Sequence, residues 1–229
     1  MIFEKGSTIL FTGDSVTDAG RERPVGEGII PGLSNGLGTG YVSCIDTFLN
    51  VWYPELLLRV VNTGVSGNTS RDLLARWQTD VTDLAPDYLV VCIGFNDVWR
   101  QFDSPCAPSF HVLPEEYEAN LRAMTAASKD RVRQMIFLTP YYLEPLTADP
   151  MRARMDEYRA ICKRVAEENG LPCIDLQETF CDYLQYRHSS YIMWDRIHPG
   201  RIGSMLIARR FLDAVGFDKP LCSRGTVLH

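Results

Sequence analysis

Residues 8–20 read TILFTGDSVTDAG, a short apolar run that changes abruptly to polar residues. The apolar run ends at Gly13, and Asp14 and Ser15 follow at once. This pattern indicates a buried strand that passes into a loop. In an open parallel sheet, ligands bind in the loops after the carboxyl ends of the strands, so Ser15 is a candidate nucleophile. Taken alone, however, the same residues can form a simple turn, because Asp and Ser often cap the first N–H groups of a helix.

Apolar runs alternate with segments of helical periodicity along the rest of the chain. Besides the first strand, the pattern predicts strands over 56–61, 87–93, 134–139 and 173–175, and helices over 41–52, 71–84, 114–128, 150–169, 176–185 and 201–215. This alternation without a compositional break predicts an α/β fold, a three-layer α/β/α sandwich around a five-stranded parallel sheet. We expect a single domain over 1–217 and a C-terminal extension over 218–229.

The composition of the 229 residues is that of a globular protein, with 45% hydrophobic and 23% charged residues. A net charge of −6 without a basic run argues against nucleic acid or an anionic membrane as partner and favours a small-molecule substrate. No apolar run approaches the ~20 residues of a membrane span. The first residues lack a secretory signal, and the seven cysteines are scattered without a Cys-x-x-Cys pair. We therefore expect a cytoplasmic protein.

The glycine-rich segment 20–40 has neither helical nor strand periodicity, which predicts a long loop over the functional edge of the sheet. Its glycines match neither the Gly-x-Gly-x-x-Gly fingerprint nor a P-loop. Ser66, in the loop 62–70, is a second candidate nucleophile. It misses the Gly-x-Ser-x-Gly pattern by one position, because Asn68 stands where glycine is needed.

His198 is the one histidine of four that lies in a motif, Trp194-Asp195-Arg196-Ile197-His198-Pro199-Gly200. Acyl transfer by a serine needs a base within hydrogen-bond reach and a carboxylate that orients the imidazole. Asp195 and His198 are three residues apart, so both can lie on one side of a single turn. Taken alone, the motif can also be a capped helix start before Pro199.

Four loops at predicted strand ends carry polar motifs in a fixed order: Gly13-Asp14-Ser15, Gly64-x-x-Gly67, Gly94-x-Asn96-Asp97 and Asp195-x-x-His198. Along nearly the whole chain this set resembles the SGNH hydrolases, the Gly-Asp-Ser-Leu group of esterases and lipases. Val16 stands where that group usually has leucine, and its side chain should pack rather than react. The resemblance implies a flavodoxin-like fold and a serine esterase that needs no metal or other cofactor.

The resemblance also implies a role for each matching residue. Ser15 would be the nucleophile, and Asp195 and His198 would complete the triad. The oxyanion hole would consist of the N–H groups of Ser15 and Gly67 and the side chain of Asn96. A glycine lets the backbone approach the oxyanion without a Cβ, and an asparagine amide donates without adding charge.

Within this family the chain is most similar to intracellular acetylxylan esterases. The similarity lies in Gly38-Thr39-Gly40-Tyr41, Gly67-Asn68-Thr69, the run from Asn96 to Gln101, Asp149-Pro150-Met151-Arg152 and Trp194-Asp195-Arg196. It implies removal of acetyl groups from xylo-oligosaccharides by a homo-oligomer, for which a ring of eight is one form. We expect Asp14, Trp99 and Trp194 to bind the substrate, since flat aromatic faces suit sugar rings. Packing under a loop is the alternative for both tryptophans.

Three other interpretations are open at this point. Asp14, Asp18 and Asp97 could be metal ligands, although no histidine stands at ligand spacing with them. A lipid esterase would use the apolar loop residues Ile29, Ile30, Leu33 and Leu37. A non-catalytic carbohydrate-binding module would use Trp99 and Trp194 alone.

Overall fold

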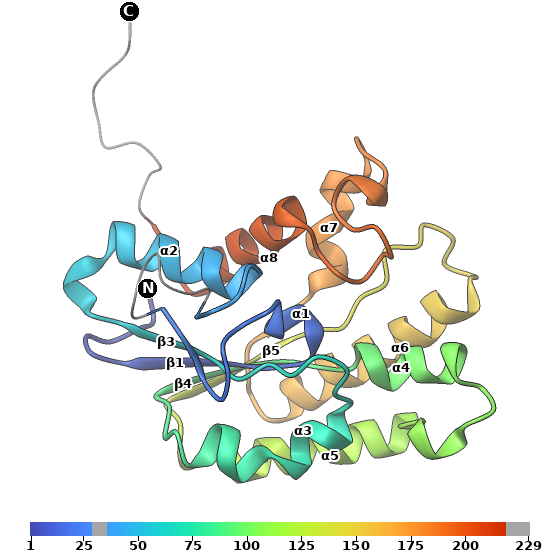
Figure 1. Ribbon diagram of the computed structural model, residues 1–229, viewed down its shortest axis with the longest axis horizontal. Helices are drawn as coiled ribbons and strands as arrows, with labels where there is room; N and C mark the ends of the chain where they lie inside the picture. Colours follow the sequence, from blue (N-terminus) through green and yellow to red (C-terminus); the bar gives the residue numbers. More distant parts are fainter. Residues whose placement is uncertain (29–35, 219–229) are drawn as a thin grey trace, which may run out of the picture.

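A computed structural model describes residues 1–28 and 36–218 of the protein. Its strands form one sheet in the order β2-β3-β1-β4-β5-β6 (Figure 1). The strands are β1 Thr8–Gly13, β2 Gly26–Glu27, β3 Arg59–Asn62, β4 Tyr88–Cys92, β5 Gln134–Leu138 and β6 Cys173–Ile174. Strands β3, β1, β4, β5 and β6 pair in parallel, which confirms the predicted α/β class and gives the order typical of flavodoxin-like folds.

The predicted number of five strands was wrong. The additional strand, β2, pairs antiparallel with β3 through Gly26 and Glu27, opposite Asn62 and Val61. Two residues inside a glycine-rich segment have no strand periodicity, so only the tertiary pairing with β3 reveals this strand.

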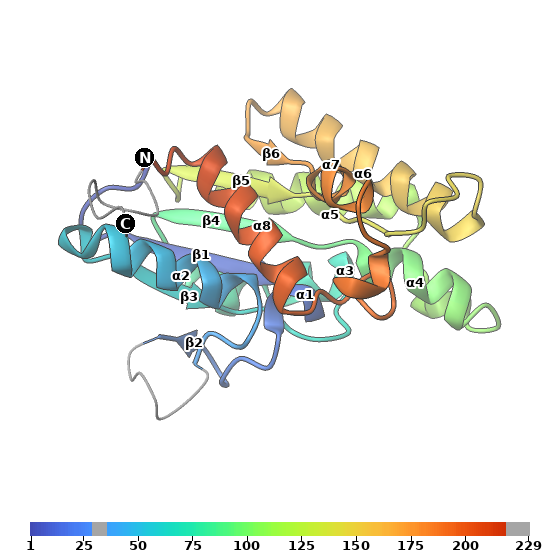
Figure 2. The same cartoon turned by 90° about the horizontal axis from the view of Figure 1, so that it is seen from above.

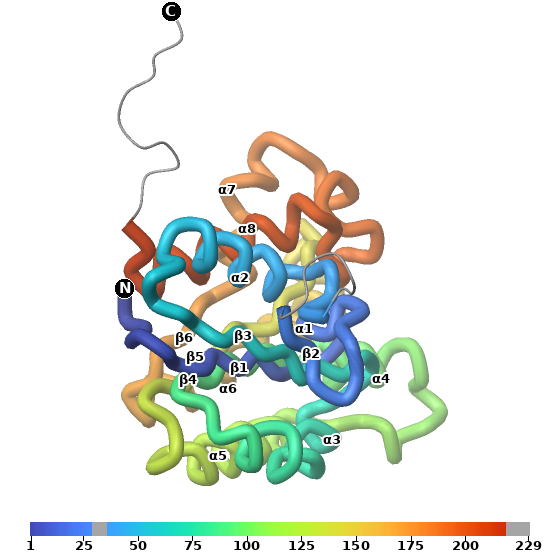
Figure 3. The backbone as a smooth tube through the Cα atoms, turned by 60° about the vertical axis from the view of Figure 1, so that its left-hand side comes forward, coloured from blue at the N-terminus to red at the C-terminus, as the bar shows by residue number. Residues whose placement is uncertain are grey.

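Helices cover both faces of the sheet, as the three-layer prediction requires. One layer holds α2 Tyr41–Trp52, α7 Leu176–Leu184 and α8 Arg201–Ala214. The other holds α3 Ser70–Ala75, α4 Phe95–Asp103, α5 Pro114–Ser128 and α6 Pro150–Glu168. Figures 1 and 3 both show these two groups on opposite sides of the strands. Among residues 1–28 and 36–218, no helix combines the length and apolar character needed to cross a bilayer.

Short helical turns connect the main elements. They are α1 Ser15–Asp18, the 3₁₀ turns η1 Pro54–Leu56, η3 Pro108–Phe110 and η4 Ser189–Tyr191, and the π-helical turn η2 Gln78–Thr82. Helices α1, α3 and α4 all begin beyond the carboxyl ends of strands, at the end of the sheet away from the amino terminus (Figure 2). This end of the sheet therefore gathers the loops that carry the predicted motifs.

The nucleophile turn depends on Gly13, the last residue of β1. A Cβ at Gly13 would lie 2.0 Å from the carbonyl oxygen of Cys92 at the end of β4, and φ is +156°. Only glycine fits here, because the two central strands approach so closely. The strand itself is buried on both faces through Ile9, Leu10 and Phe11.

Two helical predictions differ from the structure. The predicted helix 71–84 ends at Ala75, and a π turn follows, but Trp77 and Val81 are both buried, so the apolar pattern continues across the break. The motif Gly94-x-Asn96-Asp97 was predicted to lie on a loop, but residues 95–103 form α4. Phe95 and Val98 are buried on its inner face, and the polar Asn96 and Asp97 between them concealed the helical spacing.

Several predictions fall on residues outside the described part. The apolar positions Ile29, Ile30 and Leu33 lie there, as does the C-terminal extension apart from Asp218. Leu37 is described, and its side chain is buried in the core. The division into a domain over 1–217 and an extension therefore stays a prediction.

Candidate active site

The loop before α8 folds into a tight turn around the Asp195 carboxylate. Its Oδ1 accepts the main-chain N–H groups of Ile197 at 3.0 Å and His198 at 2.8 Å. The hydroxyl of the buried Tyr141 donates to the carbonyl of Ile197 at 2.6 Å and anchors this turn on the core. Asp195 and His198 are therefore held on one side of the turn, as their spacing predicted.

A hydrogen-bonded chain links three of the predicted residues. Oγ of Ser15 lies 2.7 Å from Nε2 of His198. Nδ1 of His198 lies 2.5 Å from Oδ2 of Asp195. With Nδ1–H donating to the carboxylate, Nε2 is left to accept the serine proton, which is the arrangement that nucleophilic catalysis by a serine requires.

The hydrogen bond between His198 and Asp195 shifts the pKa values of both groups. The hydrogen bond to Asp195 raises the pKa of His198 above its ordinary value of 6.5, although partial burial acts in the opposite direction. Burial raises the pKa of Asp195, but hydrogen bonds from His198 and from the two main-chain N–H groups outweigh it, and the pKa of Asp195 falls below 3.8. The carboxylate therefore stays ionised beside an imidazole that is more basic than usual.

The side chain of Asp14 caps the short helix that carries Ser15. Its Oδ1 accepts the N–H of Val16 at 3.1 Å, and the residue is fully buried. Asp14 was predicted to bind substrate, but in this structure its side chain has no exposed surface and instead caps the start of α1. Its Oδ2 has no hydrogen-bond partner among the described residues. Burial, with a smaller contribution from Asp97, raises the pKa of Asp14 from 3.8 to about 7.

Gly67 lies on the loop before α3, and Asn96 lies in the first turn of α4. Gly67 has φ +84°, in the left-handed region, and a Cβ there would meet nothing within 4 Å. The backbone conformation, rather than crowding, thus explains this glycine in the free protein. Nδ2 of Asn96 donates to the carbonyl of Asn68 at 2.9 Å, which orients the amide and leaves its second N–H for another acceptor.

The side chain of Arg76 forms hydrogen bonds to two segments of the site, and it was not identified from the sequence. Its guanidinium donates to the carbonyl of Gly13 at 2.9 Å, to the carbonyl of Thr63 at 2.8 Å and to Oδ1 of Asn68 at 2.7 Å. One residue thus fixes the strand end before Ser15 and the loop that contains Gly67. No short motif marks Arg76, because two of its partners are main-chain carbonyls, which carry no sequence signal, and they come from other segments.

The aspartates considered as metal ligands instead hold loops in place. Asp97 is buried, and its carboxylate accepts the N–H of Ser70 at 2.9 Å at the start of α3. Asp18 accepts the N–H of Ser66 at 2.8 Å and pairs with Arg23 at 2.5 Å. Within the described part of the chain, no cluster of three or more His, Cys, Asp or Glu side chains is arranged to hold a metal ion.

The two tryptophans beside the predicted catalytic residues differ in their surroundings. The ring of Trp99 is half-buried and lies 5.6 Å from the imidazole of His198, centroid to centroid. Trp194 is 84% exposed, so the alternative of packing under a loop does not apply to it within this chain. The indole of Trp194 is therefore accessible to a ligand or to another protein surface.

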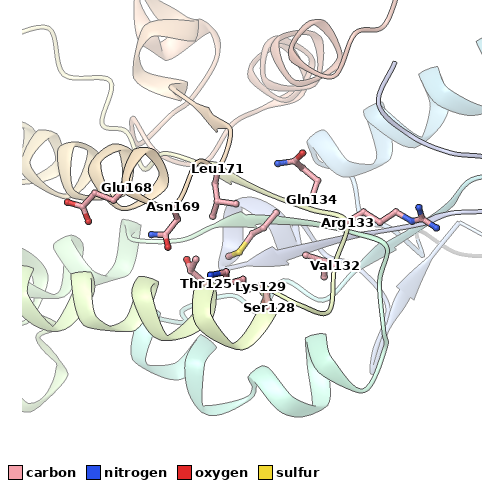
Figure 4. A pocket seen from close by; sticks show the side chains of 10 residues that line it. Thr125, Ser128, Lys129, Val132, Arg133, Gln134, Glu168, Asn169 and Leu171 are labelled. Atoms are coloured by element: carbon pink, nitrogen blue, oxygen red, sulfur yellow. The ribbon is translucent and has the colours of Figure 1, made fainter.

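Cavities lie at both ends of the sheet. One, of about 360 Å³, lies between the ends of α5 and α6 and the start of β5, lined by Ser128, Gln134 and Asn169 among others (Figure 4). It is at the amino end of the strands, away from Ser15. A second, of about 310 Å³, includes Gly67 and Arg100 in its lining and therefore adjoins the candidate site.

The fold and the hydrogen-bonded serine, histidine and aspartate agree with the known proteins that this chain resembles. The chain belongs to the GDSL-like lipase/acylhydrolase family, which matches residues 11–206. It is 46% identical over 213 residues to an acetylxylan esterase of Geobacillus stearothermophilus, covering 93% of this chain and 95% of the relative. The crystal structure of an acetylxylan esterase from that organism superposes with a TM-score of 0.91 at 45% identity, covering 95% of this chain and 98% of that one.

Two further comparisons bear on the site. Structures of the Geobacillus esterase include variants described as catalytic mutants, in which a serine, an aspartate or a histidine is replaced by alanine. An α/β hydrolase enzyme from the metagenome of Lake Arreo, Spain, is 49% identical with a TM-score of 0.90, covering 95% of this chain and 98% of that one.

Proposed function

We propose that this protein is a serine esterase that removes acetyl groups from carbohydrates such as acetylated xylo-oligosaccharides. The observation that carries the proposal is the hydrogen-bonded chain from Ser15 through His198 to Asp195. Similarity to acetylxylan esterases over almost the whole chain supports the choice of substrate. The alternative of a lipid esterase has weaker support, because Leu37 is buried and cannot contact an acyl chain.

In the proposed mechanism, Oγ of Ser15 attacks the acetyl carbonyl carbon while Nε2 of His198 takes the hydroxyl proton. Asp195 stabilises the imidazolium that forms. The negative charge on the carbonyl oxygen is held by the N–H groups of Ser15 and Gly67 and by the amide of Asn96. Ser15 is suited to this task as the first residue of α1, since the first N–H groups of a helix lack intrahelical acceptors.

Collapse of this intermediate breaks the bond to the sugar oxygen, which takes the proton from His198 and leaves as an alcohol. A water molecule then gives a proton to His198 and attacks the acetyl group on Ser15. Acetate leaves, and the proton returns from His198 to Oγ of Ser15. Trp99 and Trp194 are proposed to contact the sugar. The ring of Trp99 lies next to His198. The ring of Trp194 is exposed.

The test is acetate release from acetylated xylo-oligosaccharides by the Ser15→Ala variant. We expect kcat to fall at least about 10³-fold, because no other group replaces the nucleophile. Ser66→Ala is the matched control and should retain activity, because Ser66 contributes a main-chain N–H to Asp18. Retained activity in Ser15→Ala, or equal losses in both variants, would contradict the proposal.

We further propose that the enzyme is a cytoplasmic homo-oligomer. The segment from α7 into α8 exposes large apolar side chains, namely Tyr186, Tyr191, Trp194, Ile202 and Met205. Such a concentration is typical of a protein interface. The free thiols of the described cysteines agree with a reducing compartment. Light scattering of the purified protein tests the assembly, and a mass of 25.9 kDa, that of one chain, would contradict it.

A further inference from the structure

We propose that the groove between the start of α3 and the end of α4 is a binding subsite for a neutral sugar unit next to the acetylated one. This inference rests on the proposed function and specifies its substrate as an oligosaccharide rather than a monosaccharide. The groove has a volume of about 310 Å³, within the range of small-molecule sites, and its lining includes Gly67, Asp72, Arg100, Ser104 and Phe110.

One end of the groove adjoins the proposed oxyanion hole. Gly67 belongs to both, and Nη2 of Arg100 lies 3.5 Å from Oδ1 of Asn96, one helical turn earlier on α4. An ester whose carbonyl oxygen is held there extends from the site on its acyl side or its alcohol side. The acetyl side is a single methyl group, which cannot fill a groove of this size. The groove therefore suits the alcohol side, which is the carbohydrate.

The exposed ring of Phe110 suits the apolar face of a sugar. The side chain lies on the short turn η3 and is 60% exposed. Arg71 holds the backbone on both sides of it: Nη1 donates to the carbonyl of Ser109 at 2.9 Å and Nη2 to that of His111 at 3.0 Å. The backbone that carries the ring is therefore fixed before a ligand arrives, which lowers the entropic cost of binding.

Both arginines of the groove are paired with carboxylates, which favours a neutral ligand over an anion. Arg71 binds both carboxylate oxygens of Glu116, at 2.6 and 2.8 Å, and Arg100 pairs with Asp103. Asp72 accepts from the N–H and hydroxyl of Thr69 at 2.9 and 2.7 Å. Around the aromatic ring, the groove thus offers donors and acceptors and no unpaired arginine, and a sugar with several hydroxyl groups matches this chemistry.

The experiment compares Phe110→Ala with the wild type on p-nitrophenyl acetate, acetylated xylose and acetylated xylotriose. We expect kcat/KM for the xylotriose substrate to fall about tenfold, because the stacking surface is lost. The values for the other two substrates should stay unchanged, since neither reaches the groove. Phe110→Tyr, which keeps the aromatic face, should restore activity on the trisaccharide.

Phe102→Ala is the matched control, because Phe102 is also an exposed phenylalanine of this region but does not line the groove. An equal fall on all three substrates, or no fall on the trisaccharide, would overturn the subsite. If the wild type released no acetate from any acetylated sugar but hydrolysed p-nitrophenyl acetate, the proposed substrate class would fail instead.

Discussion

Nε2 of His198 lies 2.7 Å from Oγ of Ser15, although 183 positions separate the two residues in the chain. Two features of the fold produce this distance. Gly13 allows β1 to approach β4 closely, and Ser15 follows two residues later at the edge of the sheet. The loop that carries His198 is fixed on the core by the hydroxyl of Tyr141. The pair is thus preorganised, and activity should depend on the groups that hold each partner.

Asp195→Asn should lower kcat about 10⁴-fold in the hydrolysis of p-nitrophenyl acetate, because the amide neither selects the required histidine tautomer nor stabilises the imidazolium. Asparagine keeps an oxygen that can accept the N–H groups of Ile197 and His198, so the turn should persist. Circular dichroism and urea unfolding serve as the control for folding. A loss smaller than tenfold would show that Asp195 has no essential part in the reaction.

The pH profile of kcat/KM should have an acid limb with its midpoint above pH 6.5. His198 must be neutral to accept the serine proton, and its hydrogen bond to Asp195 raises the pKa of the imidazole. Activity should therefore increase as the pH rises through this raised value. In the residual activity of Asp195→Asn, the midpoint should move to lower pH, because the carboxylate that stabilises the imidazolium is gone. An unchanged midpoint would indicate that another group controls the limb.

Arg76→Met should lower kcat for p-nitrophenyl acetate by about 10²-fold, because the loops of Ser15 and Gly67 lose their common anchor and the reacting groups move apart. Arg76→Lys should remain impaired, since an ammonium group cannot reach the end of β1 and both acceptors in the loop 62–70 at once. Urea unfolding gives the folded fraction of each variant, and kcat is divided by this fraction. Arg122→Met is the control, as Arg122 forms surface pairs with Glu118 and Glu168. Similar kcat in all variants would contradict a positioning role.

The sequence could predict those parts of the site that lie in short motifs. Ser15 follows a strongly apolar strand, and Asp195 and His198 share one turn, but each motif alone also fits a capped turn. The order of the four motifs along the chain, and the family resemblance that it carries, singled these residues out. Arg76 could not be found in this way, because its function depends on acceptors at the end of β1 and in the loop 62–70, which only the fold brings to it.

The same distinction applies to the fold. The parallel strands are buried on both faces, and their continuous apolar runs made them predictable. Strand β2 is two residues long and exists only through its pairing with β3. Helix α4 was missed because its inner face mixes buried Phe95 and Val98 with Asn96, a polar residue placed there for the proposed oxyanion hole. Functional demands thus disrupt the very pattern on which helix prediction depends.

Asp14→Asn should stabilise the protein in alkaline solution relative to the wild type. Burial raises the pKa of Asp14 from 3.8 to about 7, so between these values the folded protein keeps a proton that the unfolded chain releases. The free energy of unfolding of the wild type therefore falls as the pH rises through this window. Asparagine can still accept the N–H of Val16 but carries no charge, so the advantage of the variant should grow by about 3 kcal/mol between about pH 5 and pH 8. Urea unfolding at both pH values measures it, with the exposed Asp130→Asn as control. If the difference in unfolding free energy between variant and wild type did not change with pH, Asp14 would have the same pKa in the folded and unfolded states.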